Sequence, residues 1–247
     1  MSDQAGLPAL VLGNSLGTSR AVWDGEAQAF RSSFRLLQYD FPGHGGSAAA
    51  PGPYTIAALG RAVLGLLDAR GVDRAAYCGI SLGGMVGMWL AANAPDRITA
   101  LGLICTSAYL PPAQGWQARA DQVRSDGMAS IAAPVVGRWF TPQYAAGHPS
   151  VVSSFRAELE RTDAEGYAGC CEAIAAMDLR GLLPKITAPT LVLAGAEDPA
   201  IPPEHGAAIA AGIAGARFDC LPGAAHLATV SADQAVTSAL LSHLRGR

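Results

Sequence analysis

The sequence is poor in charged residues, and a single lysine, Lys185, stands among its 17 basic residues. Charged side chains make up 15% of the 247 residues, and the formal net charge is −3. Proteins that bind phosphate backbones or anionic lipid surfaces carry an excess of positive charge, which this chain lacks. We therefore expect no nucleic-acid partner and no membrane partner.

Long apolar runs and cysteine motifs are also missing. No run reaches the roughly 18–20 apolar residues that cross a bilayer, and residues 1–8 lack the basic start and apolar stretch of a signal peptide. The five cysteines form no CxxC motif and no Cys/His cluster with metal-ligand spacing, and the neighbours Cys170 and Cys171 cannot easily bridge each other. We therefore expect a soluble, cytoplasmic protein with reduced cysteines and no bound metal.

Half of the residues are apolar, and short apolar or β-branched runs alternate with longer helical patterns. This alternation is typical of a mostly parallel sheet with helices on both faces. The expected strands are Ala9–Gly13, Arg35–Asp40, Ala75–Gly79, Ile98–Cys105, Thr190–Ala194 and Ala216–Leu221. The expected helices are Thr55–Arg70, Leu82–Ala94, Glu204–Ala214 and Ala232–Arg245.

The alternation stops in the middle of the chain, where the pattern indicates several amphipathic helical pieces and no strand. Thr162 followed by Glu165 resembles a capping box and predicts a helix over Asp163–Met177. In open α/β sheets ligands bind outside the carboxyl ends of the strands, so helices inserted there would cover the site. The expected division is a first core part over residues 1–110, a helical lid over residues 111–183 and a second core part over residues 184–247.

The strongest motif is Gly79-Ile80-Ser81-Leu82-Gly83, a G-x-S-x-G between an expected strand and an expected helix. In this context the serine sits on a sharp turn that exposes its hydroxyl above the sheet. The two glycines fit because a side chain at either position would clash where strand and helix approach each other. Ser81 is therefore the expected nucleophile of an α/β-hydrolase, although a bare G-x-S-x-G can also be an ordinary turn.

The acid that completes such a site is expected after the nucleophile and before the histidine. Asp198 follows the strand Thr190–Ala194 in a loop, where its side chain can turn towards Ser81. Glu197 is the rival acid, and an aspartate before a proline can also be a simple turn residue. The loop that follows Cys105 carries no carboxylate, so Asp198 is the expected acid.

The general base should follow the last strand of the sheet. His226 lies there, after the expected strand Ala216–Leu221 and downstream of both Ser81 and Asp198. The remaining histidines fit the order or the position less well; they are His44, His148, His205 and His243. His226 is therefore the expected base.

Attack by Ser81 places negative charge on a substrate carbonyl oxygen, which two backbone N–H groups should stabilise. One is expected from Leu82, directly after the nucleophile. The second is expected from the loop after the first strand, where Leu16 is the candidate. Because backbone amides act here, the side chains give little guidance to this assignment.

Five segments spread over nearly the whole chain resemble the 3-oxoadipate enol-lactonases of aromatic-compound breakdown. They are Asn14–Thr18 (N-S-L-G-T), Pro51–Ile56 (P-G-P-Y-T-I), Gly137–Pro142 (G-R-W-F-T-P), Gly166–Cys171 (G-Y-A-G-C-C) and Ala194–Pro203 (A-G-A-E-D-P-A-I-P-P). The sequence departs from that family at Phe41-Pro42, where Thr-Arg is usual, and at Thr229 and Ser231, where Asn and Glu are usual. The lost arginine bears on the acid substrate, because a cation near the site is lost with it.

The resemblance implies a serine hydrolase that opens a carboxylated enol-lactone to a 3-oxo dicarboxylic acid through an acyl-enzyme, without a cofactor. The free carboxylate of such a substrate needs a cation in an apolar pocket. Arg138 is the candidate, beside Trp139 in the lid, and Ser15 is a third substrate-binding candidate. Arg138 can equally be a solvated surface arginine, and the competing cations are Arg119, Arg156 and Arg180.

Two alternatives stay open from the sequence. The same triad serves carboxylesterases, cofactor-free perhydrolases and hydrolases that split carbon–carbon bonds of ring-cleavage products. A non-catalytic ligand-binding protein can also keep this fold, although an intact Ser81, Asp198 and His226 argues against it. The sequence leaves the oligomeric state undetermined.

Overall fold

The structure, a computed structural model, describes residues 6–245 and is built around a six-stranded sheet. The strand order is β2-β1-β3-β4-β5-β6, and all the pairings between these neighbours are parallel. The strands are β1 (Ala9–Gly13), β2 (Arg35–Gln38), β3 (Ala75–Ile80), β4 (Ile98–Ile104), β5 (Thr190–Gly195) and β6 (Arg217–Leu221). Each expected strand is present within two residues of its expected bounds, and the expected parallel sheet is confirmed.

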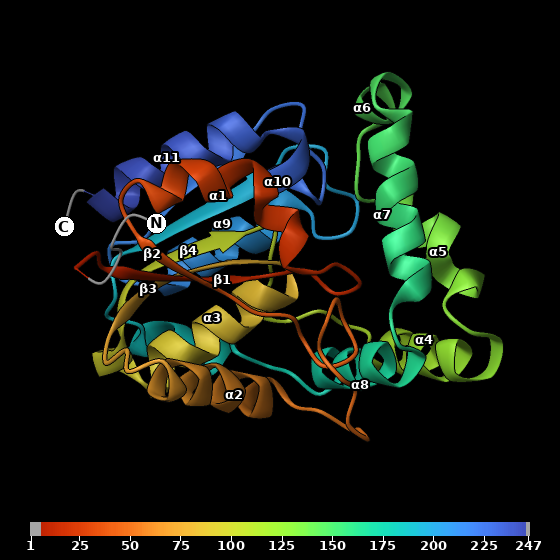
Figure 1. Ribbon diagram of the computed structural model, residues 1–247, viewed down its shortest axis with the longest axis horizontal. Coiled ribbons are helices and arrows are strands. Elements are labelled where there is room, and N and C mark those ends of the chain that lie inside the picture. Colours follow the sequence, from red (N-terminus) through yellow and green to blue (C-terminus); the bar gives the residue numbers. More distant parts are fainter. Residues whose placement is uncertain (1–5, 246–247) are drawn as a thin grey trace.

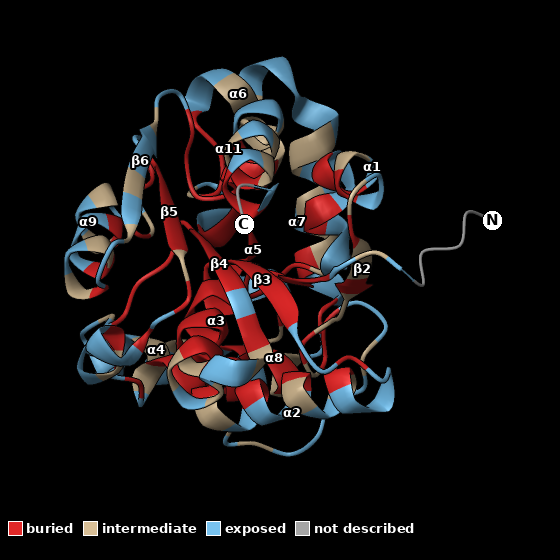
Figure 2. Cartoon of the chain, turned by 90° about the vertical axis from the view of Figure 1, so that its left-hand side faces the viewer, coloured by how far each residue is buried: buried red, intermediate tan, exposed pale blue. Residues whose placement is uncertain are grey.

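Helices cover both faces of this sheet (Figure 1). α1 (Asp24–Arg31) and α11 (Asp233–Arg245) pack together on one face, and α2 (Ile56–Ala69) and α3 (Leu82–Asn93) cover the other. α9 (Pro203–Gly212) packs on β5 and β6. β1, β3 and β5 are consequently buried throughout and β4 is buried except at Thr99, whereas the edge strand β6 is largely accessible (Figure 2). A parallel sheet needs such cover because both of its faces are apolar.

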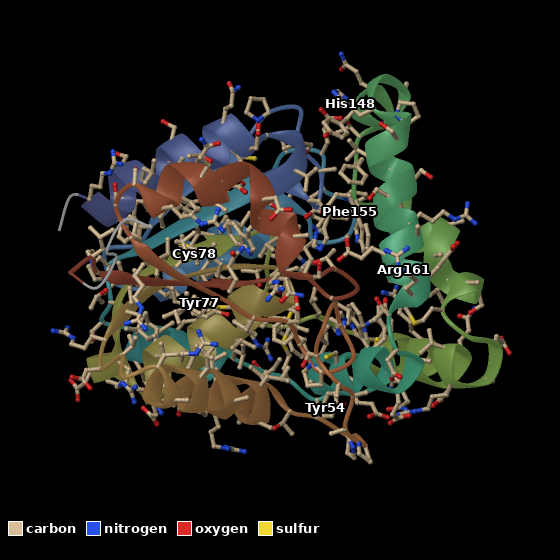
Figure 3. All side chains as sticks on the ribbon, in the orientation of Figure 1. Tyr54, Tyr77, Cys78, His148, Phe155 and Arg161 are labelled. Carbon is tan, nitrogen blue, oxygen red and sulfur yellow. The ribbon has the colours of Figure 1, made fainter. Side chains whose placement is uncertain are left out.

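The chain between β4 and β5 forms five helices, which we call the helical insertion. They are α4 (Ala113–Asp126), α5 (Ala129–Val136), α6 (Pro142–Gly147), α7 (Pro149–Arg161) and α8 (Ala164–Ala175). The insertion stands at one end of the sheet (Figure 1). Phe155 of α7 lies on the side of that helix that faces the sheet (Figure 3), and its ring meets Trp139 with 6.3 Å between centroids. α4 is joined to α8 by Arg124, which bonds Glu165 at 2.8 Å and Glu172 at 2.5 Å.

The capping-box expectation at Thr162 is wrong. Thr162 ends α7, where its hydroxyl donates to the carbonyl of Glu158 at 3.2 Å. Asp163 instead caps α8, because its carboxylate accepts the N–H of Gly166 at 2.9 Å. The side chain of Glu165 points to Arg124 and is unavailable for a reciprocal cap.

The other helices expected from the sequence are present within two residues of their bounds, but α1 was not expected. The short elements between the main ones are η1 (Arg20–Trp23), η2 (Pro95–Arg97), η3 (Arg180–Lys185) and α10 (Ala228–Ser231). Among the described residues, no helix has the length and hydropathy that crossing a bilayer requires. The outer ends of the two expected core ranges, residues 1–5 and 246–247, lie outside the described residues.

Candidate active site

Ser81 occupies the sharp turn between β3 and α3. Its φ of 54° lies in the left-handed region, which is strained for a residue with a side chain and typical of such turns. The turn closes because a Cβ on Gly79 would collide with the backbone of Gly83, and a Cβ on Gly83 would collide with the carbonyl of Gly13. The two glycines of the motif are therefore required by the close approach of strand and helix.

Ser81, His226 and Asp198 form one hydrogen-bonded chain, as the sequence predicts. Nε2 of His226 lies 3.0 Å from the hydroxyl of Ser81, and Nδ1 lies 2.8 Å from a carboxylate oxygen of Asp198. All three residues are buried, with at most 6% of any of them exposed. This burial shields the hydrogen bonds from water and strengthens them.

Asp198 is held in place by the loop that follows β5. Its second carboxylate oxygen accepts the N–H groups of Ala200 at 2.8 Å and Ile201 at 3.0 Å. Glu197, the rival acid, is exposed to solvent and bonds neither Ser81 nor His226. Asp198, and not Glu197, therefore belongs to the hydrogen-bonded chain with His226 and Ser81.

The other histidines are engaged elsewhere in the fold. His44 bonds the carbonyl of Pro42 at 2.9 Å, and His205 bonds Ser107 at 2.8 Å. The remaining two histidines are His148, stacked on Tyr144, and His243, bonded to the Pro189 carbonyl. Among the histidines, only His226 bonds Ser81.

The two amides proposed for the oxyanion come from Leu82, directly after Ser81, and from Leu16 in the loop after β1. The amides flanking Leu82 are already bonded, that of Ser81 to Ile104 and that of Gly83 to Asn14. Leu82 opens α3, where an N–H has no acceptor within the helix.

Leu16 is the second residue of a turn. The hydrogen bond that closes this turn runs from the N–H of Thr18 to the carbonyl of Ser15, at 3.2 Å. The N–H of Leu16 does not take part in it. Both leucine amides are therefore candidates to receive an oxyanion.

A pocket opens over Ser81, between the sheet and the helical insertion. Ser81, His226, Leu16 and Met85 contribute from the core. The insertion contributes Trp116 and Arg119 from α4, Val135 from α5, Arg138 and Trp139 after it, and Tyr167 and Ile174 from α8. The remaining lining residues are Ser15, Leu110, Ala200 and Ile201. Its walls thus combine apolar side chains with several polar and charged groups, as a site for a small polar molecule requires.

The sequence profile described as the alpha/beta hydrolase fold matches residues 8–232. The chain belongs to the α/β-hydrolase family. It is 40% identical to 3-oxoadipate enol-lactonase 2 of Acinetobacter baylyi, over 96% of this chain and 88% of that protein. The expected resemblance to enol-lactonases is confirmed by this match.

Two solved structures are similar over nearly the full length of this α/β-hydrolase. The enol-lactonase from Burkholderia xenovorans LB400 is 42% identical with a TM-score of 0.95, covering 97% of this chain and 92% of that one. A hydrolase from Pseudomonas aeruginosa PA01 is 48% identical with a TM-score of 0.94, covering 97% and 91%. The fold is therefore shared with these two proteins over nearly the full length of the chain.

The structure brings all three expected substrate-binding residues of this hydrolase, Arg138, Trp139 and Ser15, to the pocket. Trp139 is 3% exposed. Its carbonyl accepts, at 2.9 Å, the N–H of Leu227, which is the residue directly after His226. The hydroxyl of Ser15 is buried and has no hydrogen-bond partner among the described residues.

Two of the competing cations lie away from the pocket. Arg156 pairs with Glu160 at 2.8 Å on α7, and Arg180 pairs with Asp178 at 2.6 Å. Arg119, the third competitor, lines the pocket together with Arg138. Tyr167 of α8 also lines the pocket, and nothing local in the sequence indicates this, because its place depends on how α8 packs on the core.

Proposed function

We propose that this α/β-hydrolase opens 3-oxoadipate enol-lactone to 3-oxoadipate through an acyl-enzyme on Ser81. The observation that carries the proposal is the combination of a hydrogen-bonded Ser-His-Asp chain with arginine side chains in the wall of the same pocket. A curated relative with 40% identity bears the enol-lactonase name. The substrate is a small carboxylated lactone.

Acylation begins when His226 takes the proton of the Ser81 hydroxyl, along the 3.0 Å hydrogen bond between them. Ser81 then attacks the lactone carbonyl. Asp198, 2.8 Å from the far nitrogen of the ring, fixes the tautomer that leaves Nε2 free to accept a proton. It also stabilises the imidazolium that forms.

The oxyanion of the tetrahedral intermediate binds the amides of Leu16 and Leu82. Ring opening expels an enolate, which receives the proton from His226 and becomes the ketone by tautomerisation. Water then attacks the acyl-enzyme, with His226 again acting as the base, and releases the dicarboxylic product. These steps use only side chains and amides of the chain itself.

The helical insertion serves as the lid of the site, and Arg138 holds the free carboxylate of the substrate beside Trp139 and Ser15. A carboxylate that leaves water for an apolar pocket needs such a partner, because an unpaired buried charge is costly. All five cysteines are free thiols, which suits a reducing compartment, and we place the protein in the cytoplasm.

The test is an assay of the purified protein with enzymatically prepared enol-lactone, followed by loss of ultraviolet absorbance. A burst of p-nitrophenol from an activated ester measures acylation of Ser81 separately, and the Ser81→Ala variant is the control for both. Turnover of the lactone supports the proposal. Release of p-nitrophenol without lactone turnover rules out this substrate and leaves a carboxylesterase, whereas no p-nitrophenol release and no lactone turnover leaves a ligand-binding protein.

A further inference from the structure

Two arginines, rather than one, face the pocket above Ser81. Arg119 of α4 and Arg138 after α5 both belong to its wall, and each is partly buried. Within residues 6–245, neither guanidinium forms a salt bridge with a carboxylate. By contrast, Arg124, five residues after Arg119 on the same helix, is paired with two glutamates.

The two guanidinium groups repel each other. The pKa of Arg138 is lowered from its ordinary value, first by burial and then by the charge of Arg119. Two like charges in a partly buried pocket are unfavourable unless an anion joins them. Such an arrangement is therefore typical of a site that receives a negatively charged ligand.

Arg119 is positioned by an aromatic side chain of its own helix. Its guanidinium lies over the ring of Trp116, 4.8 Å from the centroid, which is a cation–π contact. Tyr167 of α8 lines the same pocket, and the charges of Arg119 and Arg138 lower the pKa of its phenol against the larger upward effect of burial. Tyr167 itself is buried and stacks on His44, with 6.3 Å between centroids. Because its neighbours are packed, Arg119 is oriented before a ligand arrives.

We propose that Arg119 and Arg138 together form a carboxylate site, with the Tyr167 hydroxyl beside them, and that this site selects substrates with a free carboxylate. The inference rests on the proposed function and names the residues that recognise the substrate. The tetrahedral intermediate adds an oxyanion to that carboxylate, so the pocket holds two negative charges beside two cations. The product carries two carboxylates, and short dicarboxylates are therefore expected to be competitive inhibitors.

The first test uses adipate, a six-carbon dicarboxylate, as an inhibitor of p-nitrophenyl acetate hydrolysis, and it requires no lactone. Adipamide, its uncharged diamide, is the control ligand. Arg119→Met and Arg138→Met are each expected to raise the inhibition constant of adipate about tenfold or more, since each removes a hydrogen bond to a charged group. Arg156→Met removes an arginine of the same insertion outside the pocket and is expected to leave adipate inhibition unchanged.

The second test compares the enol-lactone with its methyl ester, which keeps the ring and removes the charge. The ratio of the two kcat/KM values is expected to fall about tenfold in each variant, and the Arg119→Met/Arg138→Met protein is expected to lose nearly all preference for the acid. An equal loss on both substrates would assign Arg119 a structural role and overturn the inference. So would an unchanged ratio in Arg119→Met.

The two proposals can fail separately. If the wild type binds adipate no better than adipamide, the carboxylate site is wrong even when the lactone is hydrolysed. If adipate inhibits through both arginines but the lactone is not hydrolysed, the substrate proposal is wrong and the anion site is supported.

Discussion

Glu26 offers a sharp test of how burial governs the stability of this fold. It lies on α1 with no exposed surface, and neither of its carboxylate oxygens has a hydrogen-bond partner among the described residues. Burial, followed by the charges of Asp233 and Asp24, raises its pKa to about 9. At neutral pH the folded protein therefore holds a neutral carboxylic acid inside the helix layer.

The consequence for stability follows from proton linkage. An unfolded chain releases this proton above its ordinary pKa of 4.5, whereas the folded chain keeps it up to about 9. The unfolded state therefore binds fewer protons throughout this window, and stability falls as the pH rises. At about 1.4 kcal/mol per pH unit, the loss from Glu26 between pH 4.5 and pH 7 is about 3 kcal/mol.

The perturbation is Glu26→Gln, which keeps the shape of the side chain and cannot ionise. We expect the variant to match the wild type near pH 4.5 and to be more stable by about 3 kcal/mol at pH 7. The free energy of unfolding from urea titrations at several pH values measures this difference. Glu204→Gln, an exposed glutamate on α9, is the matched control and should show little pH-dependent gain. A gap between Glu26→Gln and wild type that stays constant with pH would refute the reasoning, because Glu26 would then titrate alike in both states.

Replacing Ser81 by alanine should lower kcat on the order of 10⁶-fold, as in serine proteases, and near-normal turnover would exclude the covalent mechanism. Asp198→Asn should lower kcat on the order of 10⁴-fold, because the amide favours the wrong tautomer of His226. Glu197→Gln should change kcat very little. The opposite result would identify Glu197 as the catalytic acid. Gly83→Ala should destabilise the protein and reduce activity, since its Cβ would meet the carbonyl of Gly13, and wild-type thermal stability in this variant would contradict the close approach seen here.

The core of the fold is predictable from the sequence because local patterns and global position agree there. Buried parallel strands are continuous apolar runs, and the elbow at Ser81 needs glycines at fixed offsets, so both can be recognised locally. The order Ser81, Asp198, His226 is likewise visible in the chain, although only the structure shows the two hydrogen bonds that join them.

The features that the sequence does not predict correctly depend on non-local contacts. α1 is short, with eight residues, and its polar sequence includes the buried Glu26, so its apolar face is hard to recognise. The side chain of Glu165 is recruited by Arg124 from another helix, which a capping-box pattern cannot reveal. Arg119 and Trp116 are three residues apart and so share one face of α4, but their meeting with Tyr167 depends on the packing of α8 against α4.

The hydrogen bond from the Leu227 amide to the Trp139 carbonyl has a mechanical consequence for the proposed lid. It ties the helical insertion to the residue that directly follows His226. A displacement of the Trp139 segment would therefore either break this bond or pull on the loop that carries His226. Movement of the helical insertion over the pocket would thus be coupled to the position of His226 beside Ser81.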